Sequence, residues 1–410
     1  MNRRRLALWR SLDSVVSQLS QAGSSLMLTL TFVHVLDPVS FGILAAFWAI
    51  WMLVMSMNRA VFGEQLIAQA NEPDLRHGYL DFGFLWSAVG IFVAVGVACL
   101  TKNYAIIPAI LCVALFVTSD MVRYSEMAGG RVNASQKFVL LPIELVRLGL
   151  GSIALWMALN DLSSPWPTVF AFLSSAVWVV FGLVVGGRPK LGRASVFVRR
   201  REKFEHLMTV QFLTGTGLSQ MIPFLALNAF GAAQFGAIRL AQSVLSPMTL
   251  VTSAFQPSLI RLYASRRKAG NLAKAVVGTV ALSLSVGVVM TIVAIAGVDI
   301  LGRYLIPPNQ VDAVNQILVP IAVLLSLVVV GQPGGALIKV FRFGGISLLG
   351  QAVGIGVTLV LCILATHRDI QTFVWALAVG SATTVTSTYL FLAFGLSRTY
   401  RGRVANSDGI

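Results

Sequence analysis

The feature that most limits how this chain can fold is a series of apolar runs, each roughly 20 residues long. A run of that length crosses about 30 Å of hydrocarbon as an α-helix. Because no water is available there, each run must satisfy its backbone hydrogen bonds internally. Runs such as residues 346–366 lack the alternation of a transmembrane β-strand. The sequence therefore predicts an all-α, polytopic membrane protein.

Composition agrees with this prediction, because 56% of the residues are hydrophobic and only 11% are charged. A soluble domain usually carries about a quarter charged residues. The outer loops are mostly too short for an extramembrane catalytic domain, so we expect no enzyme. Twelve transmembrane helices are expected, with approximate limits 12–35, 39–62, 80–100, 104–127, 137–158, 166–186, 207–229, 236–262, 276–298, 314–337, 345–365 and 371–396.

The distribution of basic residues predicts the topology. Alternate connections are rich in arginine and lysine, most of all the connection at 187–206, whereas the opposite loops hold only Lys102, Arg303 and Arg368. Cytoplasmic loops carry such an excess, so we expect an inner (cytoplasmic) membrane protein with both termini in the cytoplasm. The basic residues that give the chain its net charge of +15 lie next to the spans. This placement therefore predicts anionic membrane lipids as partners and no nucleic acid.

The chain divides into two halves of six helices each. We expect an N-terminal lobe at 1–186, a basic cytoplasmic linker at 187–206, a C-terminal lobe at 207–397 and a cytoplasmic tail at 398–410. In each half the first helix leads through a short hairpin into Phe-Gly, as Asp37-Pro-Val-Ser-Phe-Gly42 and as Gly231-Ala-Ala-Gln-Phe-Gly236. Because six is even, the two repeats are parallel, with their axis along the membrane normal.

These hairpins, the polar first helix with Gln18-Leu-Ser-Gln21, the basic linker and the twelve spans carry a family resemblance. The chain resembles the polysaccharide (lipid-linked oligosaccharide, O-antigen type) flippase branch of the multidrug/oligosaccharidyl-lipid/polysaccharide exporter superfamily. The resemblance implies two six-helix lobes around a central cavity that opens alternately to each side. It also implies a polyprenyl-pyrophosphate-linked sugar as cargo, moved to the outer leaflet for cell-surface polysaccharide biosynthesis, and polysaccharide-assembly enzymes as partners.

Polar stripes mark the helices that could line such a cavity. Spacings of four, three and four place the stripe of the first helix on one face. Facing lipid, each unpaired group would cost about 1–3 kcal/mol. An alternative is that these groups only hold helices together. The stripe residues are Ser14, Gln18, Gln21 and Ser25 in the first helix, Gln211 and Thr214 in the seventh, and Ser243, Ser246 and Thr249 in the eighth.

Charged residues inside the hydrophobic layer are expensive and usually functional. Glu144 and Arg147 lie one turn apart in the fifth helix and could pair there. Alternatively Arg147, together with Arg239 in the eighth helix, contacts the lipid-linked phosphate, because a guanidinium matches phosphate oxygens and stays charged. A carboxylate could instead couple transport to an ion, and Asp13 and Asp120 are the candidates.

Several alternatives remain open at this stage. We find no phosphate-binding loop for ATP hydrolysis, and we expect no catalytic residue, metal or cofactor. A cation-coupled multidrug exporter of the same superfamily is the closest alternative function. A lipid-modifying enzyme and a non-transporting scaffold are further ones. The segment Gly331-Gln-Pro-Gly-Gly335 predicts a bend in or near the end of the tenth helix, which suits alternating access but is also tolerated passively in membrane bundles.

Overall fold

The computed structural model confirms the all-α, polytopic fold class. It describes residues 20, 22–58, 73–102, 106–129, 140–160, 165–186, 190, 192, 221–245, 259, 260, 262, 263, 266, 271–341 and 344–407. Within these ranges every regular element is a helix. Eight of these helices are long and apolar enough to cross a membrane. They are α2, α4, α6, α7, α14, α15, α16 and α17.

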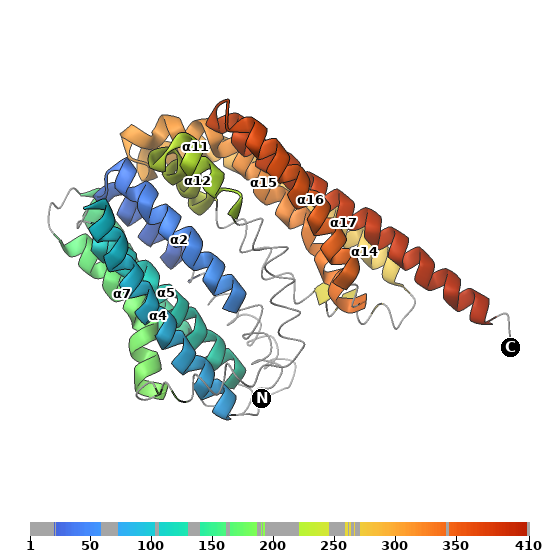
Figure 1. Cartoon of the computed structure of the whole chain (residues 1–410), viewed down its shortest axis with the longest axis horizontal. Coiled ribbons are helices and arrows are strands. Elements are labelled where there is room, and N and C mark those ends of the chain that lie inside the picture. The colour runs from blue at the N-terminus through green and yellow to red at the C-terminus, as the bar shows by residue number, and fades with distance from the viewer. Residues whose placement is uncertain are drawn as a thin grey trace. The chain divides into compact units, whose positions relative to one another are not determined.

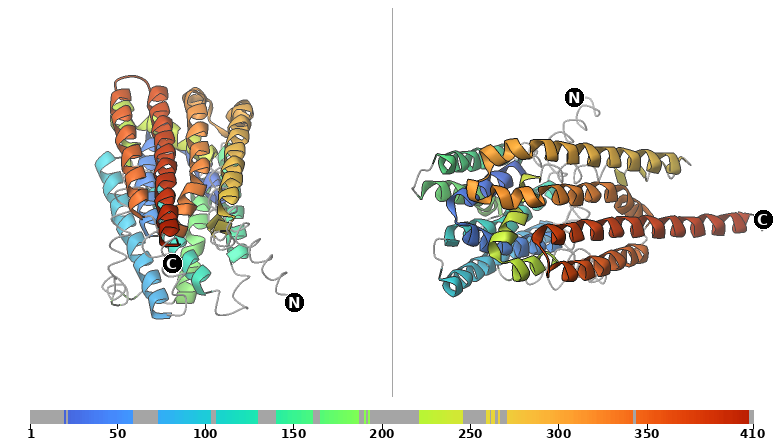
Figure 2. Two further views of the ribbon diagram at one scale, coloured as in Figure 1. Left: turned by 90° about the vertical axis from the view of Figure 1, so that its right-hand side faces the viewer. Right: turned by 90° about the horizontal axis from the view of Figure 1, so that it is seen from above.

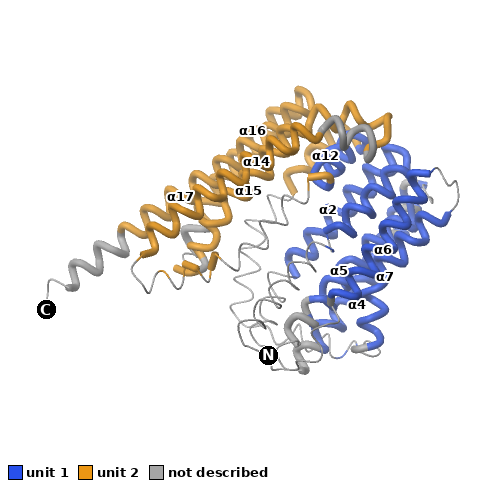
Figure 3. Tube along the Cα trace, turned by 180° about the vertical axis from the view of Figure 1, so that it is seen from behind, with its two compact units in different colours: residues 1–220, 232–243 blue, residues 221–231, 244–410 orange. Residues whose placement is uncertain are grey.

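The helices gather into two compact units, which Figure 3 shows in different colours. Unit 1 comprises residues 1–220 and 232–243, and unit 2 comprises residues 221–231 and 244–410. The short segment 232–243 therefore belongs with the N-terminal helices, although it follows the predicted linker in the sequence. The predicted lobe boundaries themselves remain a prediction.

Unit 1 is built around α5, which packs against α2, α4 and α7. Figure 1 shows α4, α5 and α7 running side by side. Polar contacts join these helices, since the Trp51 indole donates to the carbonyl of Ala114 at 3.2 Å. The unit's helices are α2 (Pro38–Asn58), α4 (Pro73–Thr101), α5 (Ile107–Gly129), α6 (Leu140–Leu159), α7 (Trp166–Gly186) and α12 (Ala232–Val244), preceded by the apolar helix Ala22–Val35.

The hairpin that was singled out in the sequence gives α2 a well-defined start. The Asp37 carboxylate accepts hydrogen bonds from the backbone N–H of Val39 at 3.0 Å and of Ser40 at 3.1 Å. This is N-cap geometry, and Pro38 occupies the first helical position, where no donor is needed. The Ser40 hydroxyl and backbone hold the pKa of the Asp37 carboxyl below its ordinary value. Asp369 caps α17 in the same way through Thr372.

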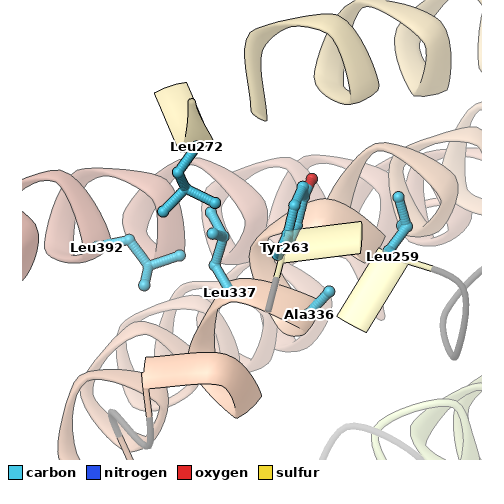
Figure 4. Packing of buried hydrophobic residues seen from close by; sticks show 6 residues of the cluster. All are labelled: Leu259, Tyr263, Leu272, Ala336, Leu337 and Leu392. Atoms are coloured by element: carbon cyan, nitrogen blue, oxygen red, sulfur yellow. The ribbon is translucent and has the colours of Figure 1, made fainter. Parts of the chain in front are cut away.

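The long helices of unit 2 run side by side in both Figure 1 and Figure 2. Within it, α15 packs against α14 and α17, and α16 packs mainly against α17. Unit 2 also contains an apolar cluster, shown in Figure 4, in which Leu259, Tyr263 and Leu272 pack with Leu337 and Leu392. The helices are α11 (Phe224–Phe230), α14 (Leu272–Leu305), α15 (Pro308–Phe341), α16 (Gly344–Ala365) and α17 (Ile370–Ser407).

The α16–α17 pair is so close that glycines face threonines across it. A Cβ atom added at Gly354 would lie 1.8 Å from the Thr384 hydroxyl oxygen, and one at Gly380 would lie 2.0 Å from that of Thr358. Close approach through small residues is how membrane helices gain packing energy without a hydrophobic driving force. Gly356, two residues along α16, has nothing within 4 Å of such an atom.

The predicted limits of a span agree best with the observed helix where a continuous apolar run ends abruptly in the sequence. The helix α7 occupies Trp166–Gly186, the expected range. In contrast α14, α15 and α17 are 34, 34 and 38 residues long and extend beyond their predicted apolar limits. The helix α17 continues to Ser407, so most of the predicted tail is helical. The structure describes residues 221–229 of the seventh predicted span, and residues 236–245, 259, 260 and 262 of the eighth.

Candidate functional site

The predicted pair in the fifth span forms inside unit 1. Arg147 Nη1 lies 3.8 Å from Glu144 Oε2, and both side chains are almost completely buried. The other carboxylate oxygen, Glu144 Oε1, accepts a hydrogen bond from the indole N–H of Trp178 at 3.0 Å. The Ser174 hydroxyl donates to the carbonyl of Arg147 at 2.8 Å, which joins α7 to α6 at the same level. Glu144 thus has a hydrogen bond on Oε1, whereas Oε2 is paired in charge with Arg147 but has no hydrogen-bond partner.

Two further charged residues, Asp120 and Arg123, lie on α5 and are also buried. Both interact electrostatically with Arg147. The charges of Asp120, Arg123, Glu144 and Arg147 sum to zero, so this buried cluster is formally neutral. Several of its nitrogens, including Arg123 Nη1 and Arg147 Nη2, have no hydrogen-bond partner. The cluster therefore keeps unused donors, but no excess charge.

The environment of Arg239 on α12 differs from that of Arg147. Its guanidinium carbon lies 5.9 Å from the centre of the Trp48 ring on α2. It donates one hydrogen bond, to the side-chain oxygen of Gln242 at a long 3.3 Å. Its Nε is buried without a partner. No acidic side chain in the described part of the chain is paired with Arg239. Among the described residues, this buried arginine is therefore a cation without a paired carboxylate.

A run of stacked rings links the two arginines. Trp48 stacks on Phe116 with 5.5 Å between ring centres and 29° between planes. Phe116 in turn lies 4.7 Å from the guanidinium carbon of Arg147. Both rings are buried. A cation over an aromatic face gains about 0.5–2 kcal/mol, most when it is desolvated. Within unit 1 the order is therefore Arg239, Trp48, Phe116, Arg147, and we call this the aromatic ladder.

The two Phe-Gly hairpins of the sequence meet directly in unit 1. A Cβ atom added at Gly236 would lie 3.0 Å from the Phe41 ring and 3.1 Å from the Cα of Gly42. One added at Gly42 would lie only 1.8 Å from the carbonyl oxygen of Ala232. The glycines therefore allow the backbones of α2 and α12 to touch. This contact brings Arg239 into reach of Trp48.

The remaining predicted site residues are only partly covered by the structure. Ser25 and Ser243 are half-buried, and Asp120 is buried. Ser14, Gln18, Gln21, Gln211, Thr214, Ser246, Thr249 and Asp13 lie outside the described residues. No group of three histidine, cysteine, aspartate or glutamate side chains that could hold a metal occurs in the ranges given above.

Sequence reasoning missed Trp48, Phe116 and Trp178, all of which contact a charged residue or connect two of them. Trp48 and Trp178 lie in spans with several other aromatic residues, so nothing local distinguishes them. The only available signal was that Phe116 lies four residues before the buried Asp120, on the same face of the helix.

Comparisons with known proteins show what this fold is similar to. No protein-family model matches the chain, and no curated protein matches it. Among solved structures, "Lipid II flippase MurJ, inward closed conformation" aligns with a TM-score of 0.65 at 13% identity, over 94% of this chain and 87% of that one. An inward-facing multidrug resistance MATE family transporter of the MOP superfamily aligns at 0.59 and 11%, over 96% of both chains.

A further neighbour is a MATE protein "in the straight conformation", with a TM-score of 0.57 at 10% identity and 96% coverage of both chains. The chain therefore shares a fold with flippases and multidrug transporters. At such low identity the likeness concerns the fold alone.

Proposed function

We propose that this protein is a transporter that flips a polyprenyl-pyrophosphate-linked oligosaccharide from the inner to the outer leaflet by alternating access. One observation carries the proposal, namely that the buried guanidinium of Arg239 has no acidic partner among the residues that the structure describes. A charge inside the hydrophobic layer is rare and usually marks a substrate path. A pyrophosphate supplies the missing negative charge and offers acceptor oxygens to the guanidinium fork. The folds of the structural neighbours, a lipid flippase among them, support this proposal.

Of the two arginines predicted to contact phosphate, Arg239 fits the role better. Arg147 already has a carboxylate partner in Glu144 and is sealed among helices. Recruiting it to a substrate would leave Glu144 as a buried, unpaired anion, which costs several kcal/mol. Within the described part of the chain Arg239 forms the long bond to Gln242, and its Nε has no partner, so N–H donors remain for a ligand.

Trp48 gives Arg239 its orientation in this proposal. A guanidinium is planar, so a ring against one of its faces leaves the in-plane N–H groups able to form two parallel bonds to a phosphate. Since Trp48 is buried and stacked on Phe116, it cannot move away easily. We assign Trp48 a positioning role, with no direct contact to the cargo.

A binding measurement on the purified protein tests the role of Arg239. The ligands are a polyprenyl-pyrophosphate sugar and the same sugar on an unphosphorylated polyprenol. Hydrogen bonds to charged groups contribute about 1.5–3 kcal/mol, so Arg239→Gln should weaken binding of the first ligand by roughly 10- to 150-fold. Arg239→Lys should restore only part of it, because an ammonium lacks the fork.

The matched control is Arg368→Gln, which removes an exposed arginine from the loop before α17. It should leave the affinity unchanged. If Arg239→Gln bound the pyrophosphate ligand as tightly as the wild type, the proposed site would be wrong.

The second candidate is a cation-coupled multidrug exporter. Two buried carboxylates, Asp120 and Glu144, favour it, because such carboxylates bind and release cations or protons. Multidrug transporters also share this fold. Efflux of a cationic dye that depends on a sodium or proton gradient, and is lost in Asp120→Asn, would favour this alternative.

A further inference from the structure

The helix α15 contains a break in its hydrogen-bonding pattern. Pro333 lies inside the helix, within the predicted bend Gly331–Gly335. Proline has no backbone N–H, so the carbonyl four residues earlier, that of Val329, loses its helical partner. In the apolar layer no water replaces that partner, and neighbouring helices must compensate. The same helix holds a second proline, Pro320.

At this break a side chain of α17 reaches the backbone of α15. The Tyr389 hydroxyl donates to the carbonyl of Val330 at 2.7 Å and accepts from the N–H of Gly334 at 3.2 Å. In a regular α-helix the N–H of residue 334 pairs with the carbonyl of residue 330. One hydroxyl therefore contacts both members of the backbone pair that follows the proline gap.

The residue types at this point allow the tyrosine to come so close. A Cβ atom added at Gly334 would lie 3.4 Å from two carbons of the Tyr389 ring, so the ring already lies against the helix backbone. A side chain inserted beside the helical hydrogen bonds is one of the few causes of a sharp helix kink. Figure 1 shows α15 and α17 side by side.

We propose that Tyr389 acts as a switch for bending α15. When α15 opens between Val330 and Gly334, the hydroxyl replaces the lost backbone bond. The helix then bends inside the membrane without leaving two polar groups unpaired. The segment beyond the break carries Ala336 and Leu337, which belong to the apolar cluster of Figure 4. Bending at Gly334 would therefore move that cluster relative to residues 308–330.

The test is a distance measurement across the break by pulsed electron paramagnetic resonance in lipid nanodiscs. Spin labels at Asn315→Cys and Val340→Cys, in a background with the exposed Cys99 replaced by serine, span 25 residues. A straight helix separates the two backbones by about 37 Å, and a bent one by less. We expect the wild type to populate the shorter distance.

Tyr389→Phe should lower the ratio of bent to straight helix by about tenfold, since bending then breaks hydrogen bonds without replacement. The control is Ser285→Ala, which removes an exposed hydroxyl of unit 2 that donates to the carbonyl of Ala281 in its own helix α14. It should leave the ratio unchanged.

A second variant guards against misfolding of Tyr389→Phe. Pro333→Ala restores the missing donor and should also favour the straight helix, whereas Pro320→Ala should not. A wild type that shows only the straight distance would overturn the proposal. So would an unchanged ratio in both Tyr389→Phe and Pro333→Ala, or an equal shift in the controls.

Discussion

Glu144→Gln perturbs the buried ion pair of unit 1. It removes the charge opposite Arg147 but keeps an oxygen that can accept from Trp178, so it isolates the ion pair. Breaking a buried pair by neutralising one partner costs about 3–5 kcal/mol. The separation of 3.8 Å is long, and Asp120 also interacts with Arg147. We therefore expect the lower end, about 3 kcal/mol.

The double variant Glu144→Gln, Arg147→Met supplies the second arm of the experiment. Replacing both charges by neutral groups of similar size is often nearly neutral, so stability should return to within about 1 kcal/mol of the wild type. The assay is reversible unfolding in mixed micelles, analysed as a double-mutant cycle. A cost of Glu144→Gln below about 1 kcal/mol, or no recovery in the double variant, would refute the reasoning. Normal transport by the double variant would show that Arg147 is structural, and lost transport would restore it as a substrate contact.

Other predictions follow from the close contacts and the helix cap. Gly354→Ala should destabilise unit 2 by about 1–3 kcal/mol through overpacking, whereas Gly356→Ala in the same helix should cost less than about 0.5 kcal/mol, both measured by unfolding in micelles. Gly42→Ala places a methyl group against the backbone of Ala232. It should therefore reduce the yield of folded protein in detergent more than Gly356→Ala, where nothing lies within 4 Å of the added atom. The hydrogen bonds of Ser40 lower the pKa of Asp37, so their stabilisation is complete above the unfolded pKa near 3.8 and is lost as pH falls through the folded value. Asp37→Asn should make the free energy of unfolding less dependent on pH between about pH 5 and 2. It should leave stability at pH 7 nearly unchanged, because asparagine also caps helices.

How far the sequence predicted the structure depends on the range of the interaction involved. The limits of α7 follow from a continuous apolar run, and the Glu144–Arg147 pair follows from helical spacing. The hydrogen bond from Trp178 to Glu144 joins residues 34 apart, so no local pattern encodes it. Such contacts depend on which helix faces which, and hydropathy carries no information about that.

The extra length of α17 has a different cause. Hydropathy ends a predicted span where charged residues begin, but a helix continues until its backbone is interrupted. Residues 398–407 contain arginines and no proline, so the helix runs on to Ser407. The sequence indicated only one of the two parts of the proposed tyrosine switch. Pro333 predicted a bend, while its partner Tyr389, 56 positions later, could be found only from tertiary packing.

Leaflet translocation in proteoliposomes tests the central claim most directly. A fluorescent polyprenyl-pyrophosphate sugar is placed in both leaflets, and a membrane-impermeant quencher reports the fraction accessible from outside over time. We predict that wild-type protein and Arg368→Gln make the whole pool accessible, and that Arg239→Gln slows this at least tenfold. Failure of the wild type to move this lipid, or equal rates for Arg239→Gln and the wild type, would contradict the account.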